Sequence, residues 1–128
     1  MKKRISGILI AFSGLLYLIA CNQAKSSKNN FIAADSITLA AGEASFHLNC
    51  SGCHTFSQDG IGPQLSGLTA NVSVDWIRKF IRDPQQIISS GDERAQQLYT
   101  KYKTGMPAFG GLKEEEINNI IAFMYSKK

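Results

Sequence analysis

The stretch that decides the fold is Cys50-Ser51-Gly52-Cys53-His54, in which two thiols and an imidazole fall within five residues. The chain has three cysteines in 128 residues, and the third one, Cys21, lies far upstream. Three uses compete for such a pair of thiols. They are a disulfide or redox dithiol, part of a zinc site, and covalent attachment of a cofactor through both sulfurs.

Covalent haem attachment accounts for all five positions, because Cys-x-x-Cys-His is the c-type haem pattern. Two thiols at this spacing reach the two vinyl groups of one porphyrin edge, and His54 follows at once as an axial ligand. A redox dithiol is typical of alternating strands and helices, which this sequence lacks. Zinc needs about four ligands, and only Cys50, Cys53, His47 and His54 are on offer. The pattern therefore predicts one haem c bound through Cys50 and Cys53.

A second axial ligand is expected, because an electron carrier keeps both faces of its iron closed. Met106 stands in Gly105-Met106-Pro107-Ala108-Phe109, where Pro107 fixes the backbone after it. A thioether sulfur is soft and neutral, and it raises the reduction potential. Met124 falls in an apolar helical stripe and is expected to pack in the core. His47 is only seven residues before His54, so we predict Met106 as the second ligand.

Periodicity beyond residue 36 is helical, with almost no β-branched alternation, and it predicts an all-α fold. Glycine and proline between residues 55 and 72 predict a loop. Ser73 is expected as the N-cap of the second helix, and a third helix is expected to follow Gly91-Asp92. Asp83-Pro84 is expected to stop the second helix, because proline restricts the residue before it. The predicted helices cover 38–50, 73–82, 92–102 and 113–126.

The first twenty residues read as an export signal, with Lys2-Lys3-Arg4 followed by an apolar run from Ile5 to Ala20. Leu18-Ile19-Ala20-Cys21 resembles the bacterial lipobox, which implies lipid attachment at Cys21. The alternative is an uncleaved anchor with an incidental cysteine. Residues 21–36 are polar and aperiodic, so they are expected to form a flexible tether. The folded domain is assigned to 37–128, on the outer side of a bacterial membrane, in the periplasm or its equivalent.

Charge excludes a nucleic-acid partner. The net charge is +4, but three of the 14 basic residues lie in the first four positions. From residue 21 onward 11 basic residues face 10 acidic ones, and no basic stripe with interleaved aromatics remains.

With these motifs in place, residues 37–126 resemble a class I monohaem cytochrome c of bacteria. The matching segments are Gly42-x-x-x-Phe46-x-x-x-Cys50, Gly62-Pro63-Gln64-Leu65-Ser66-Gly67, Trp76-Ile77-x-x-Phe80-Ile81-x-x-Pro84, Met106-Pro107-Ala108-Phe109 and Leu112-x-Glu114-Glu115-Glu116-Ile117. The resemblance implies the small cytochrome c fold, with about four helices around one haem. Lys113 departs from the family, which usually has Ser or Thr as the cap there.

The resemblance also implies specific contacts. Gly42 permits a close crossing with the last helix, where Phe46 is expected to face Phe123. The Pro63 carbonyl is expected to accept a hydrogen bond from His54, which fixes the tautomer of that ligand. The apolar shell around the cofactor is expected to include Phe46, Leu65, Trp76, Ile77 and Met124.

The implied function is one-electron transfer between redox proteins. The expected partners are an electron donor and an electron acceptor of a respiratory chain, and the protein is expected to be a lipid-anchored monomer. Lys101 and Lys103 are candidates to rim the electron port, or are simply a solvated helix face. Two alternatives stay open. One is a haem subunit of a larger oxidoreductase, and the other is a peroxidase or gas-binding sensor with a labile Met106.

Overall fold

The computed structural model of the protein describes residues 35–127, and within this range every regular element is a helix. This confirms the predicted all-α fold. Four of the helices have nine or more residues, in agreement with the expected number, and two short ones lie between them. In chain order they are α1 (Ser36–Asn49), α2 (Leu68–Asn71), α3 (Val74–Arg82), α4 (Pro84–Ser89), α5 (Glu93–Tyr102) and α6 (Glu114–Ser126).

A side chain caps the first turn of four helices, α1, α3, α4 and α5. Asp35 accepts a hydrogen bond from the Thr38 amide at 2.7 Å, so α1 begins at Ser36, two residues before the predicted start. Ser73 caps α3, as predicted, and the structure shows Asp92 as the cap of α5; each accepts a hydrogen bond from the amide three residues later. These contacts satisfy amides that have no partner inside the helix.

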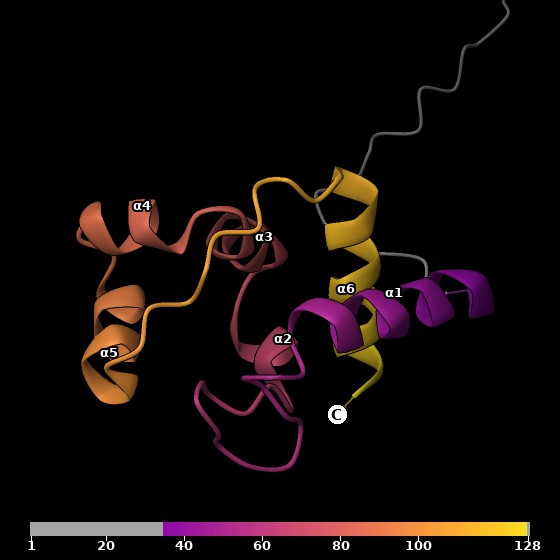
Figure 1. Cartoon of the computed structure of the whole chain (residues 1–128), viewed down its shortest axis with the longest axis horizontal. Coiled ribbons are helices and arrows are strands. Elements are labelled where there is room, and N and C mark those ends of the chain that lie inside the picture. Colours follow the sequence, from indigo (N-terminus) through magenta and orange to yellow (C-terminus); the bar gives the residue numbers. More distant parts are fainter. Residues whose placement is uncertain (1–34, 128) are drawn as a thin grey trace, which may run out of the picture.

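Helices α1 and α6 cross in direct contact at one end of the molecule (Figure 1). The crossing is close because Gly42 presents no side chain to the backbone of Asn119. The Phe46 and Phe123 ring centroids lie 5.5 Å apart, which confirms the predicted pairing, and Phe56 stacks on Phe46 at 5.0 Å. Ile117, Ile120 and Ile121 are almost fully buried behind these rings. This crossing is the main apolar core.

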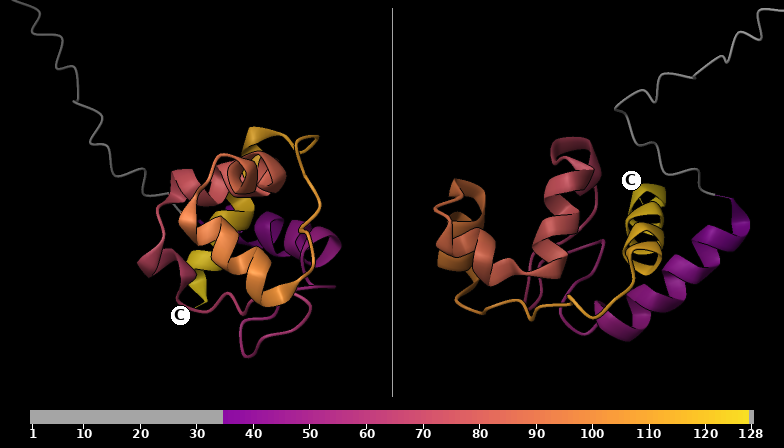
Figure 2. Two further views of the ribbon diagram at one scale, coloured as in Figure 1. Left: turned by 90° about the vertical axis from the view of Figure 1, so that its left-hand side faces the viewer. Right: turned by 90° about the horizontal axis from the view of Figure 1, so that it is seen from above.

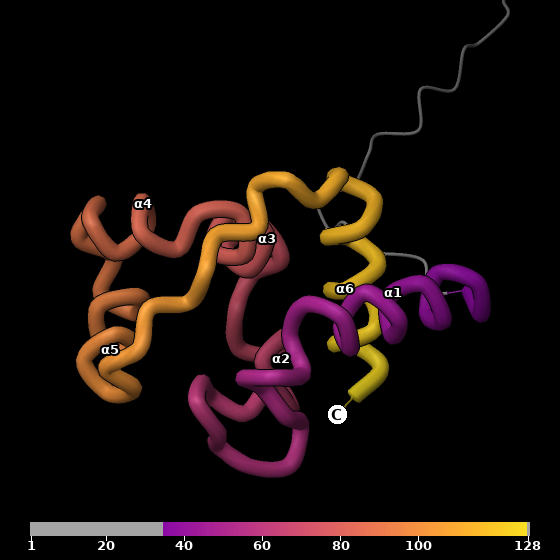
Figure 3. The backbone as a smooth tube through the Cα atoms, in the orientation of Figure 1, coloured from indigo at the N-terminus to yellow at the C-terminus, as the bar shows by residue number. Residues whose placement is uncertain are grey.

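Helices α4 and α5 form the opposite end, and α3 lies between the two ends (Figure 2). Two long segments without helix border the space between the ends. One follows α1 and leads to α2, and the other runs from α5 past α3 to α6, as the backbone tube shows (Figure 3). The first contains Cys53 and His54, and the second contains Met106. The fold thus brings these two segments to the space between its ends.

Two short helices were not predicted. Asp83-Pro84 ends α3, as expected, but it also begins α4: the Asp83 carboxylate accepts a hydrogen bond from the Gln86 amide at 3.0 Å, and Pro84 occupies the first turn. Proline needs no hydrogen-bonded N–H at that position, so the same dipeptide is a stop signal and a start signal. Helix α2 is a single turn at 68–71, within the region predicted as loop.

The last helix has only part of a cap. Glu116 accepts a hydrogen bond from the Lys113 backbone amide at 2.9 Å. The Lys113 ammonium group cannot accept a bond in return, so the reciprocal half of a capping box is missing. Arg78 of α3 contributes from outside, because its Nε lies 2.8 Å from the Glu114 carboxylate in the first turn of α6.

Among residues 35–127 no helix has the length and apolar character needed to cross a membrane. The predicted signal segment 1–20, the lipid attachment at Cys21 and most of the tether 21–36 lie outside the described residues.

Candidate functional site

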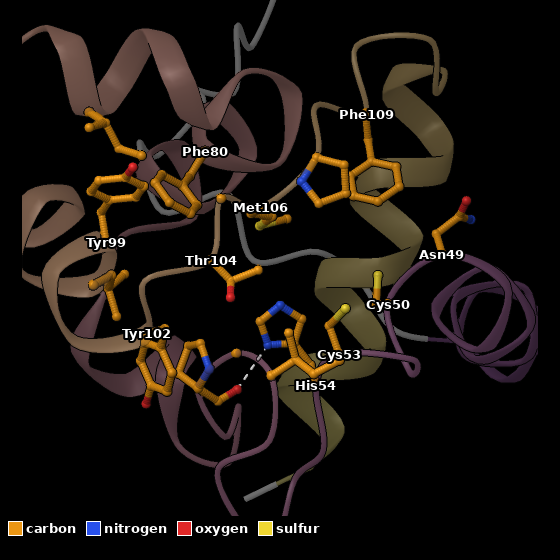
Figure 4. A pocket seen from close by; sticks show the side chains of 17 residues that line it. Asn49, Cys50, Cys53, His54, Phe80, Tyr99, Tyr102, Thr104, Met106 and Phe109 are labelled. Atoms are coloured by element: carbon orange, nitrogen blue, oxygen red, sulfur yellow. Dashed lines mark hydrogen bonds between the residues drawn. The ribbon is translucent and has the colours of Figure 1, made fainter.

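Two adjoining apolar hollows lie between the ends of the molecule, with volumes of about 720 Å³ and 680 Å³ when the space open to solvent is included. They share six lining residues and form one site: Cys50, His54, Pro63, Phe80, Leu98 and Met106. Figure 4 draws the first hollow, with Cys50, Cys53, His54 and Met106 around it. The structure therefore brings together every predicted site residue in its described range.

His54 is held in one orientation by the loop that follows it. Its Nδ1 lies 2.9 Å from the Pro63 carbonyl oxygen, the contact that the sequence predicted (Figure 4). A carbonyl only accepts, so Nδ1 carries the proton and the lone pair is left on Nε2. Gly62 lies flat against the ring, since an ideal Cβ there would be 2.4 Å from His54 Cε1. The imidazole is thus prepared to act as a ligand through Nε2.

The two thiols come from the turn that ends α1. The Cys50 amide bonds to the Phe46 carbonyl, and the amides of Cys53 and His54 both bond to the Cys50 carbonyl, at 3.1 and 3.0 Å. This turn presents both sulfurs at one edge of the hollow (Figure 4). Burial, with a smaller contribution from Cys53, raises the pKa of Cys50 to about 11, so its thiol is protonated at neutral pH.

Met106 reaches the hollows from the segment between α5 and α6. The Phe109 amide donates to the Ile81 carbonyl at 3.0 Å, which ties this segment to the end of α3. Met106 is half-buried, packs against the core and lines both hollows. His47, the other candidate ligand, lines neither of them. Its side chain is 65% exposed on α1, beside Glu43.

The walls are apolar. All five residues predicted for the shell line the second hollow: Phe46, Leu65, Trp76, Ile77 and Met124. The structure adds further wall residues that the sequence analysis did not assign to the shell, among them Phe80, Leu98 and Tyr102. The sequence could have indicated Phe80 as a wall residue, because it lies four residues after Trp76 and so on the same helix face. The two rings stack with centroids 4.7 Å apart.

One guanidinium group reaches these walls. Arg94 lines the second hollow and lies over the Trp76 ring, with Cζ 5.6 Å from the ring centroid. The indole Nε1 of Trp76 donates to Asp92 at 3.0 Å. The pKa of Asp92 is lowered, first by the hydrogen bond from the Ala95 amide and then by that indole. Trp76 is therefore fixed from both sides by polar groups at the start of α5.

The residues present fit a covalently bound haem. Two thiols stand next to an imidazole whose Nε2 is free to coordinate, a thioether lines the same space, and the remaining lining is mostly apolar and aromatic. Within residues 35–127 no three His, Cys, Asp or Glu side chains gather as ligands for a bare metal ion. The lysines proposed as a rim stand outside the lining, and Lys101 is paired with Asp59.

The sequence model of the family described as Cytochrome c matches residues 39–128. No curated protein matches the chain. Among solved structures, a cytochrome c from Rhodothermus marinus is similar at 26% identity, over 72% of this chain and 78% of that one, with a TM-score of 0.66. The cytochrome c domain of a Pseudomonas putida protein is 31% identical over 66% of this chain and 85% of its own length, with a TM-score of 0.60.

Proposed function

Since the chain belongs to the cytochrome c family, we propose that it is a one-electron carrier of the class I monohaem type. In this proposal Cys50 and Cys53 hold a single haem c, and His54 and Met106 are its axial ligands. The family itself implies covalent haem and haem-based electron transfer. The ligand set, the membrane anchor and the role as a free carrier are our proposals for this chain.

One observation carries the proposal: both thiols, an imidazole protonated on Nδ1 and a thioether all line one apolar site. A bound haem c supplies one-electron chemistry between Fe(III) and Fe(II). The chain's part is to hold His54 in the tautomer that coordinates through Nε2 and to keep Met106 within the site. The apolar walls exclude water, which limits rearrangement around the charge change.

We also propose that the chain works outside the cytoplasm on a lipid anchor. Cytochromes c of this family are typically extracytoplasmic, which agrees with the basic and apolar segment 1–20. In this proposal Cys21 carries the lipid and residues 21–34 form the tether, since Asp35 already caps the first helix of the cytochrome domain. Mass spectrometry of the mature N-terminus tests it, and an unmodified Cys21 or a chain still beginning at Met1 would contradict it.

The proposed partners are redox proteins that give and take single electrons at the haem edge, and the protein is proposed to act as a monomer. Lys101 is a poor candidate for docking them, because its ammonium group is 2.9 Å from the Asp59 carboxylate and 4.8 Å from the Tyr102 ring centroid. Lys103 is exposed next to the Met106 segment and is the better candidate.

The deciding experiment is an absorption spectrum of the oxidised and reduced protein, exported from a host with haem-attachment machinery. We expect a c-type reduced spectrum together with the ferric charge-transfer band of methionine ligation. The matched control is Cys50→Ser with Cys53→Ser, which removes both attachment points and should abolish covalent haem. Haem without the methionine band would overturn Met106 as ligand and favour a gas-binding or peroxidase site. Absence of covalent haem would overturn the proposal as a whole.

A further inference from the structure

We propose that Asp59 is a positioning residue that tunes the axial ligand His54 through the peptide group joining Pro63 to Gln64. This inference rests on the proposed function, because it concerns the strength of the ligand that His54 supplies. Asp59 lies in the loop between the thiols and α2, five residues beyond His54. The geometry of that loop carries the argument.

Two hydrogen bonds meet on a single peptide group. Its carbonyl, from Pro63, accepts the Nδ1 proton of His54 at 2.9 Å. Its N–H, from Gln64, donates to Asp59 Oδ1, also at 2.9 Å. The imidazole and the carboxylate therefore face each other across one conjugated amide, although their side chains make no direct contact.

An amide transmits charge between its two ends because its C–N bond has partial double-bond character. A carboxylate at the N–H favours the resonance form with more negative charge on the carbonyl oxygen, and hydrogen bonds arranged in a chain strengthen one another. The Pro63 oxygen then becomes a stronger acceptor for the Nδ1 proton. A stronger bond at Nδ1 makes the ligand nitrogen of a histidine more basic.

The far end of the chain of bonds is on α5. Lys101 Nζ lies 2.9 Å from Asp59 Oδ2. The lysine therefore draws negative charge away from Oδ1, the oxygen that accepts the Gln64 N–H. Asp59 is ionised at neutral pH, since the Gln64 amide first, and Lys101 after it, lower its pKa to about 2. Asp59 and Lys101 are therefore expected to act on His54 in opposite directions.

Two backbone hydrogen bonds tie the loop together on the side that faces His54. The Gly62 amide bonds to the Cys53 carbonyl at 3.0 Å, and the Gly60 amide bonds to the Gly62 carbonyl at 2.9 Å. An ideal Cβ on Gly62 would be 2.4 Å from His54 Cε1, so the Gly62 backbone lies close against the imidazole ring. We therefore expect a substitution at Asp59 to change the strength of the hydrogen bond between His54 Nδ1 and the Pro63 carbonyl rather than the position of the loop.

The test uses Asp59→Asn in the haem-loaded protein, because asparagine keeps an oxygen that can accept the Gln64 N–H while losing the charge. Two quantities are measured, the NMR resonance of the His54 Nδ1 proton in the reduced protein and the ratio of reduced to oxidised protein at fixed potential. We expect the resonance to move upfield. We expect the ratio to rise at least about threefold, or about 28 mV at 59 mV per tenfold for one electron.

Lys101→Gln is the second variant, and it should move both quantities in the opposite direction. Glu93→Gln is the matched control, since Glu93 is an exposed carboxylate on α5 that bonds to the Gln97 side chain and not to the Pro63–Gln64 peptide. It removes the same charge without touching the chain of bonds. The Nδ1 resonance should stay in place in this control.

High salt distinguishes the proposed effect through the peptide group from a through-space effect of the Asp59 charge on the iron. The distinction is possible because the Asp59 and Lys101 side chains are 45% and 63% exposed, so salt can screen their charges. At about 1 M salt the screening length falls to about 3 Å, which removes the through-space effect of an exposed charge. An Asp59→Asn effect that vanishes at this salt concentration, with an unmoved Nδ1 resonance, would overturn the proposal. Failure of the proposed function would show separately, as a wild-type spectrum without covalent haem or histidine ligation.

Discussion

The backbone carbonyl of Asn119 lies where a side chain on Gly42 would begin. An ideal Cβ on Gly42 would stand 2.0 Å from the Asn119 oxygen and 3.0 Å from Phe123 Cβ. Helices α1 and α6 therefore meet backbone to backbone at this point, and the Phe46 and Phe123 rings pack beside the contact. The carboxyl end of α1 carries Cys50, so this crossing also places the first thiol of the candidate haem site.

We expect Gly42→Ala to destabilise the protein, although alanine is the better helix former by about 1 kcal/mol. The added methyl group would overlap the Asn119 carbonyl, and overpacking of this kind costs about 1–3 kcal/mol or more. Equilibrium unfolding in denaturant measures the change. Ala41→Ser, at the exposed neighbouring position, is the control and should stay within about 0.5 kcal/mol of wild type. A Gly42→Ala protein as stable as wild type would contradict the close crossing.

Gly62→Ala tests how the loop holds His54. The new methyl group would lie 2.4 Å from Cε1 and 2.9 Å from Nδ1, so the ring must tilt or the loop must move away. Either change weakens the bond to the Pro63 carbonyl, and we expect an upfield shift of the Nδ1 proton and a stability loss of about 1–3 kcal/mol. Gly111→Ala, where a Cβ meets nothing within 4 Å, is the matched control. Equal effects of the two substitutions would count against a specific role for Gly62.

Helix starts were predictable because each depends on residues close in sequence. Ser73 accepts a hydrogen bond from the amide three positions later, so the residues that form this cap are neighbours in the sequence. The same logic should have found α4, since Asp followed by Pro is also a starting pair. A stop signal and a start signal coincide in this dipeptide, so the end of α3 hides the beginning of α4 in the sequence pattern.

The parts of the candidate site that lie within short sequence motifs could be predicted, and the contacts between residues far apart in the sequence could not. The haem ligand pattern and the Pro63 contact followed from short motifs, but the partner of Asp59 did not. Lys101 stands 42 residues further on, and nothing in the sequence pairs these two charges among many. Arg94 and Leu98 reach the hollows only because α5 packs at the end opposite α1 and α6. Such placements depend on tertiary packing, which periodicity does not specify.

Lys103→Gly is expected to stabilise the protein. Lys103 ends α5 with φ of 58°, the only non-glycine residue in the described part of the chain with a positive φ. A left-handed conformation costs an L-residue with a side chain about 1–2 kcal/mol, and glycine avoids this cost but loses more entropy on folding. We expect a net gain of about 0.5–1 kcal/mol, measured by thermal unfolding. Lys103→Ala should bring no such gain, and an equal gain in both variants would assign the effect to charge instead.

Acid should reveal the contribution of Asp59 to stability. The hydrogen bond from the Gln64 amide, followed by Lys101 and the Tyr102 hydroxyl, lowers the pKa of Asp59 from 3.8 to about 2. A carboxyl whose pKa is lower in the folded state stabilises the fold above pH 3.8, and that contribution is lost as the pH falls through about 2. The stability difference between wild type and Asp59→Asn should therefore shrink between about pH 4 and pH 2. Unfolding curves at several pH values measure it, and a difference that is constant over this range would be inconsistent with the lowered pKa.

Met106→Ala is expected to open one face of the iron if Met106 is the second axial ligand. The charge-transfer band of methionine ligation should disappear, and cyanide should bind at least about tenfold more tightly, or about 1.4 kcal/mol, because no internal ligand competes with it. Met124→Leu and His47→Gln are the matched controls. Met124 is 3% exposed in the core and His47 faces solvent on α1, so both variants should keep the band and the wild-type cyanide affinity. If His47→Gln abolished the wild-type ligation while Met106→Ala preserved it, His47 and not Met106 would be the second axial ligand. That outcome would contradict the structure, in which Met106 lines both hollows and His47 lines neither.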